Sequence, residues 1–337
     1  MARGGWKPMQ FVAQTFAFVR RLFPPLPLPG PSAALSATLL TAGCAMSLPA
    51  TQPAMQPGIP PDPTDPDAIV ACYESERDLV TRLPAALCRG EIVDEREAAR
   101  LEAARNLRVQ AAARQFGVGS ATENRRLSGS GTGILVSQNG GEILTNFHVV
   151  RSCAVISVTA ADGTNTPARL RAKDGERDLA LLSSGLTDEG RTVAAFNADP
   201  ASASPFRLAV IGFPLQGVPT ILSSLTPAIA RPQDLASQSP QFLVGGSVEP
   251  GHSGSPLVDQ SGNVVGLVKA KIDSVAFYRK TGQIVDDIGL AISNPAIFEF
   301  LEAHDVSFRV EPSGPPLSDE DILATARQFV VRVNCWR

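Results

Sequence analysis

The stretch Gly251-His252-Ser253-Gly254-Ser255-Pro256-Leu257 decides the fold, because it places a serine in a Gly-x-Ser-Gly turn. Two earlier stretches could activate such a serine. Thr145-Asn146-Phe147-His148-Val149-Val150 has a histidine after a predicted strand, and Arg177-Asp178-Leu179-Ala180-Leu181-Leu182 has an aspartate entering one. A serine hydroxyl is a weak nucleophile at neutral pH, and it needs a base that a third group orients. The three stretches predict these parts in the chain order His, Asp, Ser.

In this prediction Ser253 attacks a carbonyl, His148 takes its proton, and Asp178 orients the imidazole. The backbone N–H groups of Gly251 and Ser253 are expected to bind the resulting oxyanion. Each residue also has a plainer interpretation: a turn serine, a core histidine and a capping aspartate. We expect His252 to be an exposed turn residue, with its side chain pointing away from Ser253, and His304 to be inert.

Composition bounds the class of protein. The chain has 337 residues, enough for one or two cores, and 33 acidic against 30 basic residues give a net charge of −3. That balance indicates no nucleic-acid partner. No apolar run reaches the roughly 18 residues of a membrane-spanning helix. No Cys-x-x-Cys pair or His/Cys spacing suits zinc, so we expect no metal and no other cofactor.

A glycine-rich run, 128–136, enters a predicted strand and lacks the Gly-Lys-Ser/Thr ending of a phosphate loop. Further strand candidates are 142–150, 155–159, 178–183, 207–213 and 264–270. Turn residues separate these short segments, and no helices alternate with them. The pattern predicts an antiparallel, mainly β sandwich or barrel.

Residues 1–44 form a predicted leader with a small, apolar segment at 32–42. Leu40-Thr41-Ala42-Gly43-Cys44 resembles a bacterial lipobox, although Thr41 stands where leucine is usual. The resemblance implies that Cys44 is lipidated and anchors the protein to a membrane. The alternative is an ordinary secretory signal cut near 45–50. A proline-rich linker, 45–66, follows.

Segment 67–120 predicts a helical hairpin. Its first helix spans 68–83, and its second begins at a capping box of Asp94 and Glu97 and runs to about Gln115. A short helix is predicted at 299–305. In the tail, 311–337, we expect a helix at 317–328 with Ser318 as its N-cap and a strand at 329–334.

The stretches around the three candidate residues resemble the trypsin-like superfamily, and within it the HtrA (Deg) proteases of bacterial envelopes. Matching stretches are 131–136, 145–150, 178–182, Ile211-Gly212-Phe213-Pro214 and 289–292, and the intervals of 30 and 75 residues between His, Asp and Ser agree. The resemblance implies two packed six-stranded antiparallel β-barrels over 121–310, with their boundary near 200 and the site in the cleft between them. We expect no downstream PDZ domain, because the remaining length leaves no room for one. His252 and Ser255 depart from the family pattern.

The whole arrangement, including the terminal Cys-Trp-Arg, also resembles a group of uncharacterised trypsin-like proteins of proteobacteria. Four cysteines remain once Cys44 is set aside, and they allow three pairings that sequence does not choose between. Cys72–Cys88 is the natural local pair and Cys153–Cys335 the long-range one; four buried thiols are the alternative. We expect the strand at 329–334 to pack on the first barrel, fastened by Cys335 to Cys153.

The resemblance places the specificity pocket at Ser247, Val268, Lys269 and Ala270, and the neutral Ser247 favours small or medium apolar side chains before the cut. Lys269 and Lys271 would instead favour acidic ones. The sequence thus predicts a serine endopeptidase of the bacterial cell envelope that acts on proteins or peptides through an acyl-enzyme. Alternatives are a catalytically inert binding or scaffold lipoprotein with this fold, and an esterase.

Overall fold

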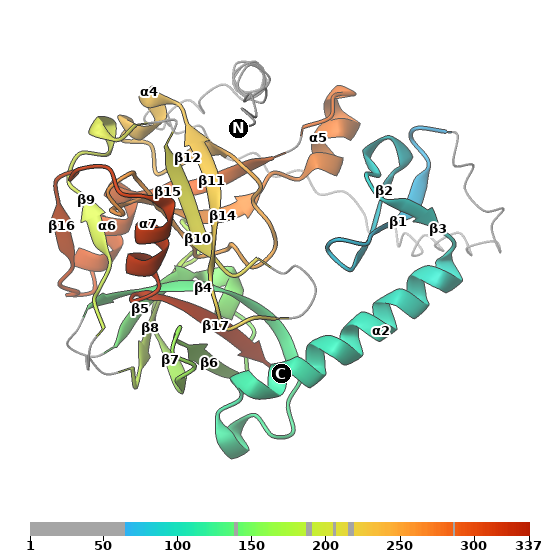
Figure 1. The fold of residues 1–337 in the computed structure, drawn as a ribbon, viewed down its shortest axis with the longest axis horizontal. Coiled ribbons are helices and arrows are strands. Elements are labelled where there is room, and N and C mark those ends of the chain that lie inside the picture. Colours follow the sequence, from blue (N-terminus) through green and yellow to red (C-terminus); the bar gives the residue numbers. More distant parts are fainter. Residues whose placement is uncertain (1–64, 138–140, 187–190, 205–206, 215–218, 286) are drawn as a thin grey trace, which may run out of the picture. The chain divides into compact units, whose positions relative to one another are not determined.

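The computed structural model describes residues 65–137, 141–186, 191–204, 207–214, 219–285 and 287–337 (Figure 1). The predicted leader at 1–44, the lipidation site at Cys44 and linker residues 45–64 lie outside the described residues. Within the described part, no helix is both long and apolar enough to cross a membrane. The chain is mainly β, as the sequence predicts, and its strands form two closed six-stranded barrels.

The predicted N-terminal helical hairpin is wrong in its first half. Residues 68–83 form an antiparallel pair, β1 (Ile69–Glu74) and β2 (Leu79–Pro84), and β3 (Glu91–Val93) adds to β1. The turn closes at Asp78, whose φ of 48° is left-handed. Apolar residues here fit both a helical and a strand period, and the β-branched and aromatic residues at 69, 70, 73, 80 and 81 favour strands.

The Cys72–Cys88 disulfide is present in the structure and joins β1 to the segment before β3. The second predicted helix is confirmed as α2 (Glu95–Ala113), where the Asp94 carboxylate accepts from the N–H groups of Arg96 and Glu97. Satisfying two N-terminal donors in this way stabilises the start of the helix by about 1 kcal/mol. We call β1 to β3 with their turns the N-terminal sheet.

The first barrel is closed, and its six strands follow the order β17-β4-β5-β8-β7-β6. Its strands are β4 (Leu127–Ser137), β5 (Glu142–Asn146), β6 (Val155–Thr159), β7 (Asn165–Asp174), β8 (Leu179–Ser184) and β17 (Val330–Trp336). The predicted strand at 142–150 is shorter, because residues after Asn146 turn into α3 (Phe147–Val150). This change of direction matters for the site described below.

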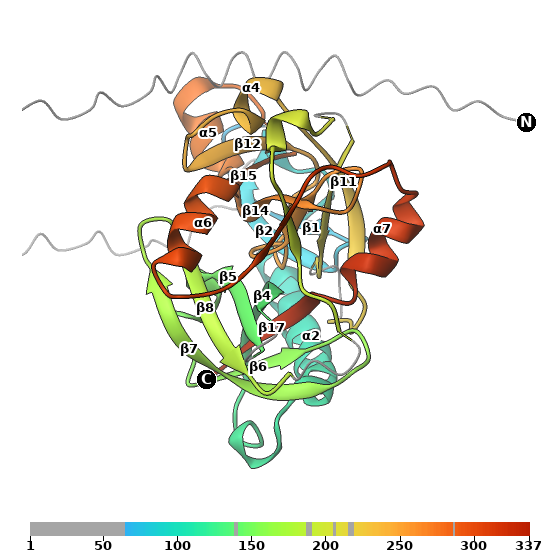
Figure 2. The same cartoon turned by 90° about the vertical axis from the view of Figure 1, so that its left-hand side faces the viewer.

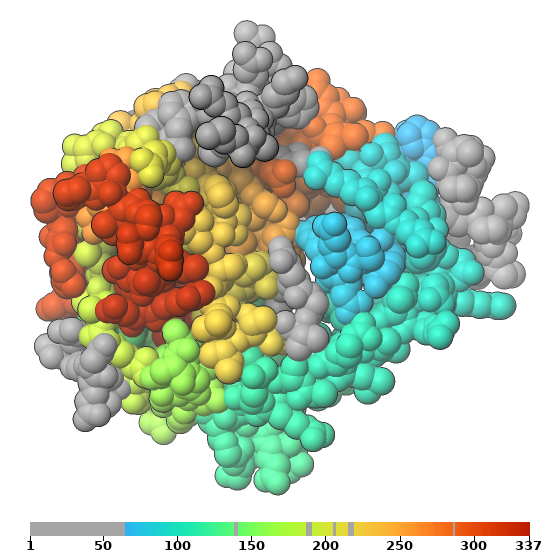
Figure 3. All heavy atoms as spheres, viewed as in Figure 1, coloured from blue at the N-terminus to red at the C-terminus, as the bar shows by residue number. Residues whose placement is uncertain are grey.

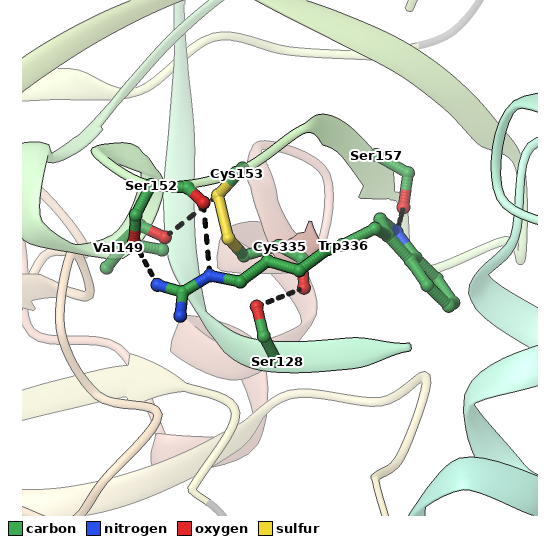
Figure 4. Close-up of a disulfide and its surroundings, with 8 residues drawn as sticks. Ser128, Val149, Ser152, Cys153, Ser157, Cys335 and Trp336 are labelled. Atoms are coloured by element: carbon green, nitrogen blue, oxygen red, sulfur yellow. Dashed lines mark hydrogen bonds between the residues drawn. A yellow bond between two sulfur atoms is a disulfide. The ribbon is translucent and has the colours of Figure 1, made fainter. Parts of the chain in front are cut away.

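The C-terminal strand is part of the first barrel. β17 pairs antiparallel with both β4 and β6, so it fills the space between two strands that would otherwise be edges. Figure 4 shows the Cys153–Cys335 disulfide beside it, with Trp336 donating to Ser157 and Ser128 to the Cys335 carbonyl. The last strand of the tail is therefore an integral strand of the first barrel.

The second barrel has the strand order β13-β10-β11-β12-β15-β14, and it is closed by pairing between β13 and β14. Outside the barrel, β9 pairs parallel with β14, and β16 pairs parallel with β9. Its strands are β10 (Leu208–Gly212), β11 (Ser224–Ala230), β12 (Gln241–Gly245), β13 (Pro256–Val258), β14 (Val264–Lys271) and β15 (Ile288–Ser293), with β9 (Ala195–Asn197) and β16 (Arg309–Glu311) added. Two clusters of buried apolar side chains fill the interiors of the barrels, and the larger cluster contains residues of both barrels.

Helices lie on the outside of the second barrel. They are α4 (Pro232–Leu235), α5 (Ser274–Thr281), α6 (Asn294–Glu302) and α7 (Asp319–Ala326). The chain also has short 3₁₀ turns at Ala85–Leu87, Arg114–Phe116, Gly119–Ala121 and Pro200–Ser202. α6 packs against β14 and β15, while α7 lies near β11 (Figure 2). Ser318 caps α7 as predicted, by accepting from the Asp321 N–H.

Candidate active site

Backbone conformation and backbone hydrogen bonds fix the position of Asp178. Its φ of 63° is left-handed, a conformation that aspartate tolerates better than most residues. The Asp178 carbonyl accepts from the Phe147 N–H at 3.1 Å and from the Asn146 side-chain amide at 3.0 Å. Since Asn146 pairs with Leu179 across β5 and β8, the ladder brings the start of α3 beside Asp178.

His148, the second residue of α3, makes two hydrogen bonds to that carboxylate. Its backbone N–H donates to Asp178 Oδ1 at 2.8 Å, and its ring Nδ1 lies 2.6 Å from Oδ2. A carboxylate only accepts, so the proton sits on Nδ1 of the neutral ring and leaves Nε2 as an acceptor. The His148 side chain is 37% exposed, which leaves Nε2 facing the surface where a substrate can approach.

Ser253 completes the chain of contacts. Its Oγ lies 2.9 Å from His148 Nε2 and 3.3 Å from the Lys269 carbonyl on β14. The hydroxyl has one proton, so it donates to only one of these acceptors at a time, and the shorter contact is to the imidazole. The structure thus brings together the three residues that the sequence singled out.

The loop before Ser253 is fastened to the first barrel. The Thr132 N–H donates to the Ser253 carbonyl at 2.8 Å, and the Thr132 hydroxyl donates to the Gly251 carbonyl at 2.9 Å. Gly251 has a φ of 96° and Gly254 one of 83°. A Cβ at Gly254 would lie 2.0 Å from the Thr132 carbonyl oxygen, so both conformation and space require glycine there.

This arrangement leaves the amides of Gly251 and Ser253 unused. Neither N–H donates a hydrogen bond to any of the residues that the structure describes. The Gly251 carbonyl, in contrast, accepts a hydrogen bond from the Thr132 hydroxyl. Two free N–H groups two residues apart form a ready site for a negatively charged oxygen.

The sequence-based expectation for His252 is wrong: the side chain is 1% exposed. Its Nδ1 accepts the Glu249 N–H at 3.0 Å, and its Nε2 has no hydrogen-bond partner among the described residues. Burial lowers the pKa of the imidazole from 6.5 to about 4. The His252 ring makes no hydrogen bond to Ser253 in the described part of the chain, and it instead ties Glu249 within the same loop. His304 follows the C-terminal end of α6, and its Nδ1 lies 2.8 Å from the Phe300 carbonyl oxygen of that helix.

Of the four residues expected to form the specificity pocket, only Ser247 lines the cavity between the N-terminal sheet and the second barrel, and none of the three catalytic candidates lines it. That cavity has a volume of about 600 Å³, and Glu249 and Lys271 also line it. Val268 is fully buried in the core of the second barrel, Lys269 is half-buried, and Ala270 is exposed. Residues 74–77 of the N-terminal sheet form another wall, which sequence spacing gave no reason to expect.

Comparison with known proteins agrees with this geometry. Residues 131–267 match the model of the trypsin-like peptidase domain. The chain is 30% identical over 217 residues to an uncharacterised protein, y4bJ, of Sinorhizobium fredii, covering 64% of this chain and 34% of that protein. It is 28% identical over 198 residues to the serine protease Do-like HtrA of Bacillus subtilis, covering 56% and 42%.

A third relative is the periplasmic serine endoprotease DegP of Escherichia coli K12, 25% identical over 146 residues that cover 43% of this chain and 31% of DegP. The chain therefore spans between about a third and two fifths of the length of these curated relatives. The matched range, 131–267, includes His148, Asp178 and Ser253. Residues 131–267 therefore form a trypsin-like peptidase domain, similar to the serine protease domains of HtrA-type proteins.

Proposed function

We propose that this protein is a serine endopeptidase that cleaves peptide bonds through Ser253, His148 and Asp178 by way of an acyl-enzyme. The observation that carries the proposal is the continuous pair of hydrogen bonds, 2.6 Å and 2.9 Å long, from the Asp178 carboxylate through the imidazole to the Ser253 hydroxyl. The same residue types in the same contacts serve this chemistry on unrelated folds.

In the first half of the reaction, Ser253 Oγ attacks the peptide carbonyl carbon while His148 Nε2 takes its proton. The carbonyl π electrons move to the oxygen, and the Gly251 and Ser253 N–H groups stabilise the resulting oxyanion. When the C–N bond breaks, the protonated His148 donates that proton to the leaving amine. Asp178 stays ionised and stabilises the imidazolium.

In the second half, a water molecule takes the place of the amine. His148 accepts a proton from this water, the hydroxide attacks the acyl carbon, and the C–Oγ bond breaks as Ser253 recovers its proton. The substrate's carboxylate product leaves, and the site is restored. The exposed edge of the imidazole provides the access that this step needs.

The envelope location is part of the proposal. Disulfides persist in oxidising compartments such as the bacterial periplasm, and the structure holds two. The lipobox-like sequence ending at Cys44 adds a membrane anchor. Cell fractionation tests this point: full-length protein is expected in the membrane fraction, and Cys44→Ser protein in the soluble envelope fraction. Equal distribution of the two would contradict the anchor.

The activity is tested with a fluorophosphonate probe and with casein as substrate. Wild-type protein is expected to be labelled and to digest casein, whereas Ser253→Ala loses both. Labelling that survives in Ser253→Ala, or no reaction of the wild type even in the presence of protein substrate, would reject the peptidase proposal. The second outcome would favour the inert binding or scaffold lipoprotein, and turnover of short-chain esters without casein digestion would favour an esterase.

A further inference from the structure

The turn between β1 and β2 reaches the loop that carries Ser253, although the two are far apart along the chain. Arg77, in this turn, forms an ion pair with Glu74 at 2.7 Å and another with Glu249. Glu249 lies four residues before Ser253. Through the Arg77 guanidinium the N-terminal sheet thus contacts the loop that carries Ser253, which sequence analysis does not reveal.

Glu249 is a buried carboxylate. Its side chain is 7% exposed, and one of its oxygens, Oε1, accepts from the Ser247 hydroxyl at 3.0 Å. A buried charge is strongly destabilising unless it is paired and hydrogen-bonded. Arg77 forms an ion pair with Glu249. The position of the Glu249 side chain therefore depends on the N-terminal sheet.

The Glu249 backbone is in turn tied to the candidate oxyanion site. Its N–H donates to His252 Nδ1, and its carbonyl accepts from the His252 N–H, both at 3.0 Å. These two reciprocal bonds close a four-residue turn in which Gly251 is the third residue. A change in the position of Glu249 consequently changes where the Gly251 amide points.

Glu249 also matters electrostatically. Its carboxylate is two residues from the Gly251 N–H, where negative charge develops as the peptide carbonyl is attacked. An unpaired carboxylate there would oppose that charge, and in a partly buried site the interaction is screened little by water. A guanidinium paired with Glu249 removes this opposition.

We propose that Arg77 is a positioning residue of the active site: by holding and neutralising Glu249, the N-terminal sheet keeps the turn 249–252 in the form that binds the oxyanion. The inference rests on the proposed peptidase function. The pair lies in the wall of the cavity between the N-terminal sheet and the second barrel, whose surfaces meet near α5 in Figure 3. If Arg77 releases the Glu249 side chain, this cavity leaves room for the side chain to rotate. Such a rotation would break the hydrogen bond from the Glu249 N–H to His252 Nδ1.

The kinetic test is a set of variants assayed on one peptide substrate. Arg77→Ala is expected to lower kcat by about 10- to 100-fold, less than the full loss of an oxyanion donor, with KM changed less than about threefold. Arg77→Lys keeps the charge and recovers part of the loss. Arg77→Ala combined with Glu249→Gln recovers most of it, because no carboxylate remains to be neutralised.

Arg82→Ala is the matched control. Arg82 belongs to the same sheet, but its ion pairs go to Glu95 and Glu102 of α2. We expect its kcat within about twofold of wild type. If Arg77→Ala behaves like Arg82→Ala, or if the double variant is no better than Arg77→Ala, the proposal is overturned while the peptidase function stands.

A second measurement does not depend on activity. The chain has three histidines, so NMR titration can follow the His252 ring, assigned by comparison with His252→Asn. In the wild type its pKa is about 4. In Arg77→Ala the opened turn exposes the ring beside an uncompensated carboxylate, and both effects raise the pKa toward 6.5. An unchanged His252 pKa in Arg77→Ala overturns the proposal even if the wild type proves not to be a peptidase.

Discussion

Cys335 on the C-terminal strand is bonded to Cys153, which follows His148 by five residues. The bond links the last strand of the first barrel to the segment that leaves α3, the short helix that presents the imidazole. The C-terminal strand is thus covalently joined to the chain next to the candidate general base. The stability of this part of the barrel and the order of the site are therefore coupled.

Replacing both cysteines of this bond should destabilise the protein more than replacing the other pair. The two residues are 182 apart in sequence, and the loop-entropy model gives about 5 kcal/mol for such a crosslink. Cys72 and Cys88 are 16 apart, for which the model gives about 3 kcal/mol. Urea unfolding of Cys153→Ser/Cys335→Ser and Cys72→Ser/Cys88→Ser measures both. Equal losses, or a larger loss for the local pair, would contradict the coupling.

Asp178→Asn should abolish most activity with little effect on folding. Asparagine tolerates the left-handed backbone at this position, but its amide stabilises the wrong tautomer of His148 and no imidazolium. We expect kcat to fall by about 10⁴-fold while the urea midpoint stays within the range of ordinary surface variants. Peptide hydrolysis and circular dichroism are the two assays. A variant with near-normal turnover would exclude Asp178 from the catalytic machinery.

Thr132→Val removes the hydroxyl that fastens the Ser253 loop to the first barrel. That hydroxyl donates to the Gly251 carbonyl and accepts from the Phe213 N–H, both buried. Leaving them unpaired should lower the free energy of unfolding by about 1–3 kcal/mol. Turnover should fall by about tenfold, a cost of about 1.4 kcal/mol in the transition state. Thr132→Ser, which keeps the hydroxyl, is the control and should retain turnover; equal turnover in the two variants would argue against this role.

The buried His252 predicts a specific dependence of stability on pH. Its pKa is about 4 in the folded chain and 6.5 when the chain is unfolded, so the unfolded state binds more protons between these values. Stability from this group is complete above about pH 6.5 and is lost as the pH falls to about 4, by roughly 3 kcal/mol in total. Below pH 4 both states are protonated, and the contribution stays constant.

The measurement is urea unfolding of wild type and His252→Asn from pH 4 to pH 7. Carboxylates titrate in both proteins, so the difference between the two curves isolates His252. We expect the wild type to lose more stability than the variant across this window. Parallel curves would show that the imidazole is not held neutral in the folded chain.

Much of the fold follows from local sequence because strands, caps and tight turns leave strong local signals. The strands at 155–159, 178–183 and 264–270 are found within a residue or two of their predicted bounds. Asp94 and Ser318 cap α2 and α7, as their residue types and positions predict. The segment 68–83 failed because its apolar residues fit two periods at once, and only pairing with β3 and the Cys72 bond decide between them.

The sequence by itself determined the chemistry that is available: a Gly-x-Ser-Gly turn, a histidine after a strand and an aspartate before one, in an order and spacing that suit two barrels. Tertiary structure alone decided what surrounds it. Packing buries His252, inserts β17 between β4 and β6, and brings Arg77 to Glu249. Such contacts join residues far apart in the chain, and neither periodicity nor residue type records which distant surfaces will meet when the apolar faces close on one another.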